Sequence, residues 1–162
     1  MKILVYGKAN SGKSKIAEEM TLKIARKKPI YVATYLDNFG DLQMKQKIEI
    51  HKRRREGKFK AVEEPYDIGF VVKEGETYLI ECLSMLVFNN LGKIDALLSS
   101  LKKTLTCKAD IVFVLNEPEE GFTPEDKESK EYAEALKNVK KLMLLECDEV
   151  YEVRDGVKRR MK

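Results

Sequence analysis

Two stretches of the sequence carry side chains whose types and spacing suit phosphate chemistry. The first is GKANSGKS, residues 7–14, which fits the pattern G-x-x-x-x-G-K-[ST] between an apolar run and a helical pattern. The second is KIEIHKRRREGKF, residues 47–59, where the chain's one histidine, His51, precedes four consecutive cations. The first stretch indicates a phosphate-binding loop. The second raises the question of whether His51 is a reactive group or a solvated one.

In a loop of this pattern, the glycines let successive backbone N–H groups point at phosphate oxygens. The helix that follows presents the positive end of its dipole to the same ligand. Lys13 is expected to reach the β- and γ-phosphates, and Ser14 to ligate Mg²⁺. We therefore expect a nucleoside triphosphate to be bound by the whole loop: Gly7, Lys8, Ala9, Asn10, Ser11, Gly12, Lys13 and Ser14.

A magnesium ion at such a loop also needs a carboxylate at the end of a neighbouring strand. Glu81 follows the apolar residues of TYLIECL (77–83), and we expect it to hold Mg²⁺ together with Ser14. Asn116-Glu117, after IVFVL, is a second candidate at the same edge of the predicted sheet, where ligands of such folds bind.

The residues around His51 allow three interpretations. His51 is a solvated residue on a charged helix, or part of a nucleic-acid contact formed with Lys52 to Arg55. Alternatively, its imidazole attacks an α-phosphate and forms a covalent phosphoramidate, with the adjacent cations stabilising the charge. The basic run lacks interleaved aromatic residues, and the net charge is only +4, from 31 basic and 27 acidic residues. Both observations argue against nucleic acid, but the residues alone do not decide the role of His51.

Apolar runs of strand length alternate with helical patterns along the chain. Strands are expected at 3–6, 29–35, 77–83 and 110–117, and helices from Lys13, over about 37–56, over about 93–105, and from Pro124 to Leu145. The stretches 59–65 and 67–75 are expected to be short strands or loops, and 148–162 a hairpin around Asp155-Gly156. This order predicts an α/β fold of the P-loop NTPase type. Its mostly parallel sheet is flanked by helices and ends in a C-terminal antiparallel hairpin, all in one domain over 1–162.

Composition limits the class of protein. Hydrophobic residues make up 43% and charged residues 36% of the chain, which is typical of a globular protein. The three cysteines, Cys82, Cys107 and Cys147, form no C-x-x-C pair, so we expect reduced thiols and neither a disulfide framework nor a metal site. No apolar run approaches the ~18 residues of a membrane helix, and we see no signal peptide. The expectation is a soluble, cytoplasmic protein.

A resemblance to a known family adds to these predictions of fold and chemistry. The loop is followed, in order, by YVATY, KIEIHKRRR, FKAVEEP, LIECLSMLVFNNL and VLNEPEEGFTPED. In this order and spacing the chain resembles the bifunctional adenosylcobinamide kinase / adenosylcobinamide-phosphate guanylyltransferase family of cobalamin biosynthesis. The resemblance is good over about 1–91 and fair over 110–126. It implies a kinase acting on a corrinoid side chain, a second activity that moves GMP from GTP through a histidine, and a homotrimer.

The resemblance also implies roles for individual residues. His51 is the expected guanylylated nucleophile, with Lys52, Arg53 and Arg54 beside the phosphates. Further nucleotide contacts are expected from Ala33, Thr34, Tyr35, Glu63 and Glu81, the last also on the Mg²⁺ side of the site. The implied partners are a corrinoid and a nucleoside triphosphate, ATP or GTP, with no nucleic acid and no membrane span.

The chain departs from the family pattern in its C-terminal part. The stretch 118–120 differs from the expected loop, and the family's R-D-x-A-G-x-x-N-Q helix is not recognisable in 127–145. Two alternatives therefore stay open. One is a P-loop kinase with a different small acceptor. The other is a nucleotide-sensing binding module that uses the cations of 52–60 to contact a nucleic-acid or protein partner.

Overall fold

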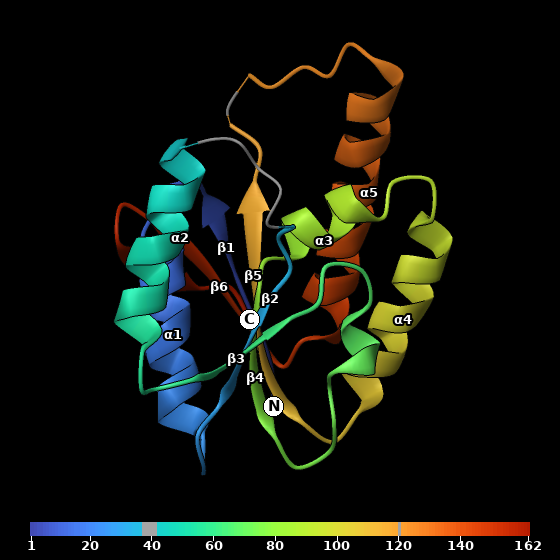
Figure 1. The fold of residues 1–162 in the computed structure, drawn as a ribbon. Helices are drawn as coiled ribbons and strands as arrows, with labels where there is room; N and C mark the ends of the chain where they lie inside the picture. Colours follow the sequence, from blue (N-terminus) through green and yellow to red (C-terminus); the bar gives the residue numbers. More distant parts are fainter. Residues whose placement is uncertain (37–41, 120) are drawn as a thin grey trace.

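A computed structural model of the protein describes residues 1–36, 42–119 and 121–162 (Figure 1). Within these ranges seven strands form one sheet in the order β3-β2-β4-β5-β1-β6-β7. The strands are β1 (Lys2–Lys8), β2 (Ile30–Ala33), β3 (Lys60–Glu63), β4 (Thr77–Glu81), β5 (Asp110–Glu117), β6 (Glu149–Arg154) and β7 (Val157–Arg160). Every neighbouring pair is parallel except β6–β7. The predicted mostly parallel sheet with a terminal antiparallel hairpin is confirmed.

Helices cover both faces of this sheet. They are α1 (Lys13–Ile24), α2 (Leu42–Arg55), α3 (Leu83–Asn89), α4 (Ile94–Thr106) and α5 (Lys127–Glu146), with a short 3-10 helix at Ile68–Phe70. Figure 1 shows α1 and α2 on one side of the sheet and α3, α4 and α5 on the other. Among the described helices, none is both long and apolar enough to cross a lipid bilayer.

Successive side chains of the central strands enter two separate apolar clusters. Ile3 and Val5 of β1 pack on the side of α1, whereas Leu4 between them packs on the side of α4 and α5. All three are at most 2% exposed. Because side chains alternate along a strand, a strand that is buried on both faces has an unbroken apolar run. This pattern is the reason that β1, β4 and β5 were predictable from the sequence.

Parallel pairing brings the chemically interesting segments to one edge of the sheet. Gly7 of β1 lies opposite Asn116 of β5, and Glu81 of β4 lies opposite Ala33 of β2. The phosphate-binding loop, the acidic end of β4 and the residues after β2 therefore emerge side by side at the carboxyl edge, where open α/β sheets bind their ligands.

The structure differs from the sequence-based expectations in three segments. The helix expected from Pro124 begins at Lys127, because the Asp126 carboxylate caps it by accepting the Ser129 N–H at 2.6 Å. The apolar stretch after Glu81 is helix α3, and residues 67–75 contain only the 3-10 turn. Of the helix expected over 37–56, α2 accounts for 42–55, and 37–41 lie outside the described residues.

The predicted C-terminal hairpin contacts the phosphate-binding loop. Asp155 and Gly156 both have positive φ, 49° and 77°, as a tight two-residue hairpin turn requires. The Gly156 N–H donates to the Ser11 carbonyl at 2.7 Å. A Cβ on Gly7 would lie 2.5 Å from the carbonyl oxygen of Val153, so only glycine fits there. The hairpin thus packs directly against the phosphate-binding loop.

Candidate active site

The phosphate-binding loop has the backbone geometry that its sequence predicted. Gly12, immediately before α1, has φ 90°, and Asn10 has φ 60°, so the chain makes the tight left-handed turns that a phosphate cradle needs. The Lys13 ammonium donates to the Lys8 carbonyl at 2.9 Å, and its residue is only 5% exposed. Burial lowers the pKa of Lys13, while the negative charge of Glu81 acts in the opposite direction. A buried ammonium inside a ring of backbone groups is suited to receive an anion.

Ser14 and Glu81 meet beside the loop. The Ser14 hydroxyl donates to Glu81 Oε1, and Glu81 Oε2 is buried without a hydrogen-bond partner among the described residues. A hydroxyl and a carboxylate with a free oxygen are ligands that Mg²⁺ prefers. The described residues contain no group of three or more His, Cys, Asp and Glu that would hold a metal by itself. This donor set therefore fits a Mg²⁺ ion that takes its other ligands from phosphate and water.

His51 lines the same cavity as the loop. The cavity has a volume of about 520 Å³ and is bounded by the loop and by residues of β2, α2, α3 and the ends of β4 and β5. Lys13, Ser14, His51 and Glu81 are all in its wall. Helix α2 thus brings the histidine, far from the loop in sequence, to the side of the phosphate-binding site.

The environment of His51 favours its neutral form. Burial lowers the pKa of the imidazole below its ordinary value of 6.5, and the positive charges of Arg54 and Arg55 act in the same direction. The negative charge of Glu81 partly opposes them. An imidazole that is neutral at physiological pH has a free lone pair, which is the state required of a nucleophile.

Cys82 is a second potential nucleophile in the cavity wall, but its protonation state is unfavourable. It is fully buried, and burial raises the pKa of its thiol. Since the thiolate is the reactive form, Cys82 is inert at neutral pH compared with His51. All three cysteines are free, as the sequence predicted.

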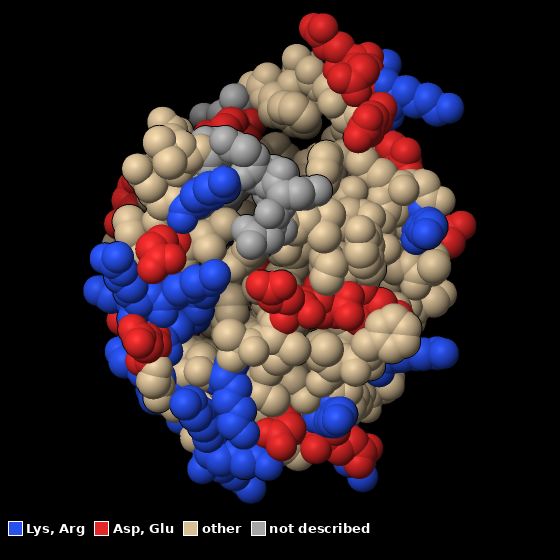
Figure 2. Space-filling model, viewed as in Figure 1, with Lys and Arg blue, Asp and Glu red and all other residues tan. Residues whose placement is uncertain are grey.

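The four cations that follow His51 occupy different environments. Arg54 lines the cavity and binds Glu18 of α1 through two contacts, Nε–Oε2 at 2.5 Å and Nη2–Oε1 at 2.9 Å. Lys52 and Arg53 are exposed and line a separate groove of about 350 Å³, here called the outer groove, whose wall also includes residues of β2 and β3. Figure 2 shows Lys and Arg side chains gathered on this α1–α2 side of the molecule. Of the three cations expected beside the phosphates, only Arg54 is in the wall of the cavity.

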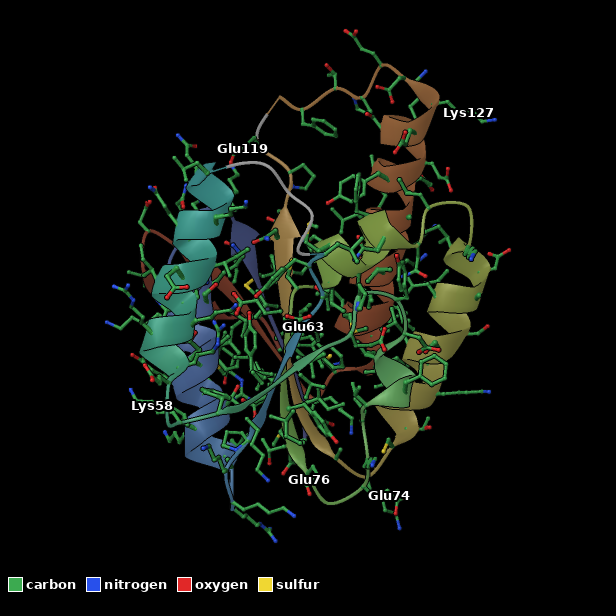
Figure 3. All side chains as sticks on the ribbon, viewed as in Figure 1. Lys58, Glu63, Glu74, Glu76, Glu119 and Lys127 are labelled. Carbon is green, nitrogen blue, oxygen red and sulfur yellow. The ribbon has the colours of Figure 1, made fainter. Side chains whose placement is uncertain are left out.

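The other expected nucleotide contacts are also divided. Ala9, Asn10, Gly12 and Tyr35 line the cavity, whereas Gly7, Lys8 and Ser11 line a neighbouring one of about 480 Å³ whose wall also includes residues of β6. Ala33 is buried, and Thr34 is tied to Cys82 by hydrogen bonds of 2.7 and 2.8 Å. Glu63 is exposed on the edge strand β3 and is not in the wall of the cavity (Figure 3).

The second candidate pair at the carboxyl edge is split between two environments. Asn116 lines the cavity, and its side-chain amide contacts Cys82 Sγ at 3.5 Å. Glu117 is instead paired with Lys140 of α5, so its carboxylate is already neutralised. Of the two carboxylates considered for Mg²⁺, the structure brings only Glu81 to Ser14.

Several residues of the cavity wall were not predicted. Tyr31, Lys47 and Arg55 line it together with His51. Lys47 and Arg55 lie four residues before and after His51, so the helical period places all three on one face of α2. That spacing was a usable signal. No comparable signal distinguished Tyr31, because the sequence pattern predicts only that it belongs to a buried strand.

Comparisons with known proteins identify the family of this chain. The family profile described as "Cobinamide kinase / cobinamide phosphate guanyltransferase" matches residues 3–161. The bifunctional adenosylcobalamin biosynthesis protein CobP of Pseudomonas aeruginosa is 27% identical, over 93% of this chain and 91% of that protein. CobU of Escherichia coli, another bifunctional adenosylcobalamin biosynthesis protein, is 25% identical over 97% of both chains.

Among solved structures, the flagellar accessory protein FlaH of Methanocaldococcus jannaschii is similar in fold, with a TM-score of 0.51 and 14% sequence identity. The similarity covers 99% of this chain and 77% of FlaH, and at this identity it concerns the fold alone. The family profile extends over nearly the whole sequence, including the loop and the His51 helix. The chain belongs to the cobinamide kinase / cobinamide phosphate guanyltransferase family.

Proposed function

We propose that this protein is a bifunctional transferase that phosphorylates adenosylcobinamide and then transfers GMP from GTP to the resulting phosphate through His51. One observation carries the proposal beyond family membership. The loop lysine and His51, which the two reactions would use, line a single cavity. Its volume of about 520 Å³ lies within the range expected for a small-molecule site, ~300–1,000 Å³.

The kinase reaction would use the loop and α1. Backbone N–H groups of residues 7–14 hold the phosphate oxygens, and Lys13 neutralises the charge that develops as the γ-phosphoryl group leaves. The acceptor hydroxyl attacks the γ-phosphorus, the bond to the β-phosphate oxygen breaks, and the nucleoside diphosphate departs. Little covalent chemistry is asked of the protein, because positioning and electrostatics supply most of the acceleration.

Ser14 and Glu81 would hold Mg²⁺ at this site. Their meeting beside the loop, and the buried free oxygen of Glu81, support this assignment. When bound, the ion neutralises negative charge on the phosphate oxygens and fixes their geometry. The negative charge of the same carboxylate also raises the pKa of His51 against the effect of burial, so that Glu81 acts on both halves of the site electrostatically.

The guanylyl transfer would use the neutral imidazole of His51. Its nitrogen attacks the α-phosphorus of GTP, a P–N bond forms, and the Pα–O bond to pyrophosphate breaks. An oxygen of the cobinamide phosphate then attacks the same phosphorus, the P–N bond breaks, and His51 is regenerated. The covalent intermediate divides one difficult transfer into two easier ones. The lowered pKa of His51 supports this role, because the imidazole needs no base to activate it.

Assembly and location follow the family resemblance. We infer a homotrimer in the cytoplasm, with the corrinoid as the acceptor for both transfers. Light scattering of the purified protein tests the first inference. A mass near three times the 18.7 kDa chain is expected, and a monomer would contradict it.

The activities are tested by supplying adenosylcobinamide and Mg²⁺ with ATP or GTP, and separating the products. The intact protein should form both the phosphate and the GDP derivative. His51→Asn, which keeps a planar polar side chain, should still form the phosphate but no GDP derivative. The proposal is wrong if adenosylcobinamide is not phosphorylated under any of these conditions, or if the folded His51→Asn variant makes both products.

A further inference from the structure

Two arginines of α2 share one buried carboxylate of α1. Glu18 is 4% exposed, and both its oxygens are occupied by the Arg54 guanidinium. Arg55 Nη1 lies 3.7 Å from Glu18 Oε1, which is close enough for electrostatic attraction but too far for a hydrogen bond. Two positive charges and one negative charge leave one cation in excess at the junction of the two helices.

The excess cation is Arg55, and its guanidinium is held rigidly. Its central carbon lies 3.4 Å from the centre of the Tyr31 ring. Tyr31 is itself buried and packs edge-to-face on Phe59, with ring centres 6.5 Å apart. A guanidinium stacked on an aromatic ring keeps its N–H groups in the plane parallel to that ring, where they are free to bind an acceptor.

Among the described residues, Nη1 of Arg55 lacks that acceptor. The residue is 6% exposed, and Nη1 has no hydrogen-bond partner in the described ranges. A buried charged donor without a hydrogen-bond partner is costly, since stacking and a distant carboxylate do not replace the hydrogen bond that it made to water. Such a group in a cavity wall indicates where a ligand supplies the missing acceptor.

Arg55 and Tyr31 form the wall between two hollows, and one of them suits an anion better than the other. In the outer groove the carboxylates Glu49 and Glu56 balance the cations Lys52 and Arg53. In the inner cavity three lysines, Lys13, Lys15 and Lys47, outnumber the one carboxylate of the described lining, Glu81, and His51 lies one helical turn before Arg55. An anion is therefore favoured on the inner side, between the phosphate-binding loop and His51.

We propose that Arg55 binds a non-bridging oxygen of the nucleotide α-phosphate while His51 attacks it. This inference rests on the proposed guanylyl transfer and names the cation that serves it. Arg55 stays protonated throughout. Its N–H donates to the oxygen on which negative charge grows as the P–N bond forms and the bond to pyrophosphate breaks. Arg54, bound to Glu18, is not available for this contact, and Lys52 and Arg53 face the outer groove.

The test compares Arg55→Gln and Arg55→Lys with Arg159→Gln. Arg159 is exposed on β7, at the opposite edge of the sheet from β3, and provides a matched loss of one guanidinium. The protein is mixed with Mg²⁺ and GTP labelled at the α-phosphate, and the rate of covalent labelling is followed at saturating GTP. Thermal melting of each variant establishes the folded fraction to which the rates refer.

Arg55→Gln should slow labelling by about 100-fold, as expected for removing one donor to a developing oxyanion. Arg55→Lys keeps the charge without the planar fork and should recover part of the rate, to about 10-fold below the unmodified protein. Arg159→Gln should label at the unmodified rate. A lower melting temperature with an unchanged labelling rate in Arg55→Gln would overturn the proposal and leave Arg55 with a packing role only.

A second measurement separates this inference from the proposed function. GTP affinity is measured by calorimetry in the His51→Asn background, where no transfer takes place. Adding Arg55→Gln should weaken GTP binding by about tenfold, because a charge-assisted hydrogen bond is lost. If the unmodified protein forms no covalent label, the guanylyl transfer is wrong, but this affinity still decides the role of Arg55. Equal affinity with and without Arg55 would overturn it.

Discussion

The two faces of the sheet treat buried polar groups differently. On the α3–α5 face these groups are satisfied. Ser84 binds the Asn116 carbonyl at 2.9 Å, and the Asn90 amide binds the carbonyls of Tyr66 and Leu86 at 2.9 and 2.7 Å. Around the loop and α2, three buried polar atoms lack a hydrogen-bond partner among the described residues, and they are Ser11 Oγ, Arg55 Nη1 and Glu81 Oε2.

This difference indicates where a ligand binds. A native core leaves few buried polar groups unpaired, because each one costs free energy. Here all three belong to the walls of the two cavities beside the phosphate-binding loop. The α3–α5 face pairs its buried polar groups internally, whereas the loop and the α1–α2 face leave these three atoms for a ligand. Three substitutions and one change of pH test this contrast.

The largest effect is expected for Lys13→Ala on the α1–α2 face. Loss of the ammonium removes its neutralisation of transferring phosphate, so both transfers should slow by about 1,000-fold. The rates of phosphorylation and of covalent labelling are the measurements. Lys23→Ala, at an exposed position of the same helix, is the control. A loss confined to one of the two reactions would contradict a shared phosphate site.

The converse is expected for Leu101→Ala on the α4 side. Leu101 is fully buried, so the substitution leaves a cavity and should cost about 3 kcal/mol of unfolding free energy. Chemical denaturation measures this loss, and calorimetry measures GTP affinity under native conditions. Stability should fall while GTP affinity stays unchanged. A matching drop in affinity would mean that the two faces are not independent.

Glu81→Gln sharpens the assignment of the metal ligand. The amide keeps the shape of the carboxylate but loses its charge. The factor by which Mg²⁺ strengthens GTP binding should therefore be about tenfold smaller in the variant than in the parent. Titrations with Mg²⁺ and with EDTA, in the parent and in the variant, give this difference. If Mg²⁺ strengthens binding equally in both proteins, Glu81 is not a ligand.

The smallest effect is expected from pH. Burial lowers the pKa of His51, so the neutral nucleophile predominates down to a pH below 6.5, the ordinary value for histidine. The labelling rate should therefore rise with pH, pass its half-maximum below pH 6.5, and be level at neutral pH. A midpoint above 6.5 would indicate that the negative charges of Glu81 and Glu18 outweigh burial and the two arginines.

Much of this arrangement was predictable from local patterns. The loop sequence, the apolar strands and the turn at Asp155-Gly156 each follow from residues that are adjacent in the chain. The meeting of Ser14 and Glu81 also followed, because parallel strands place their carboxyl ends at one edge. The position of Glu63 relative to the cavity and the start of α5 did not follow as expected, since strand edges and helix caps depend on details of local geometry.

The contacts between α1 and α2 could not be predicted from the sequence. The run Lys52 to Arg55 reads as one basic patch, yet its members turn by about 100° per residue around a helix. Only the docking of α2 on α1 decides that Arg54 meets Glu18 and that Arg55 stacks on Tyr31. The helical spacing places Arg55 on the same face as His51, but only tertiary packing shows which contacts each of the four cations makes.

Covalent transfer of GMP through His51 is tested most directly by labelling of the intact protein. The protein is incubated with Mg²⁺ and GTP labelled at the α-phosphate, denatured, and treated with alkali or acid. A phosphoramidate on His51 predicts label that survives alkali, is released by acid, and is absent from His51→Asn. Folded protein that binds GTP without acquiring label, or label that persists in His51→Asn, would contradict the account.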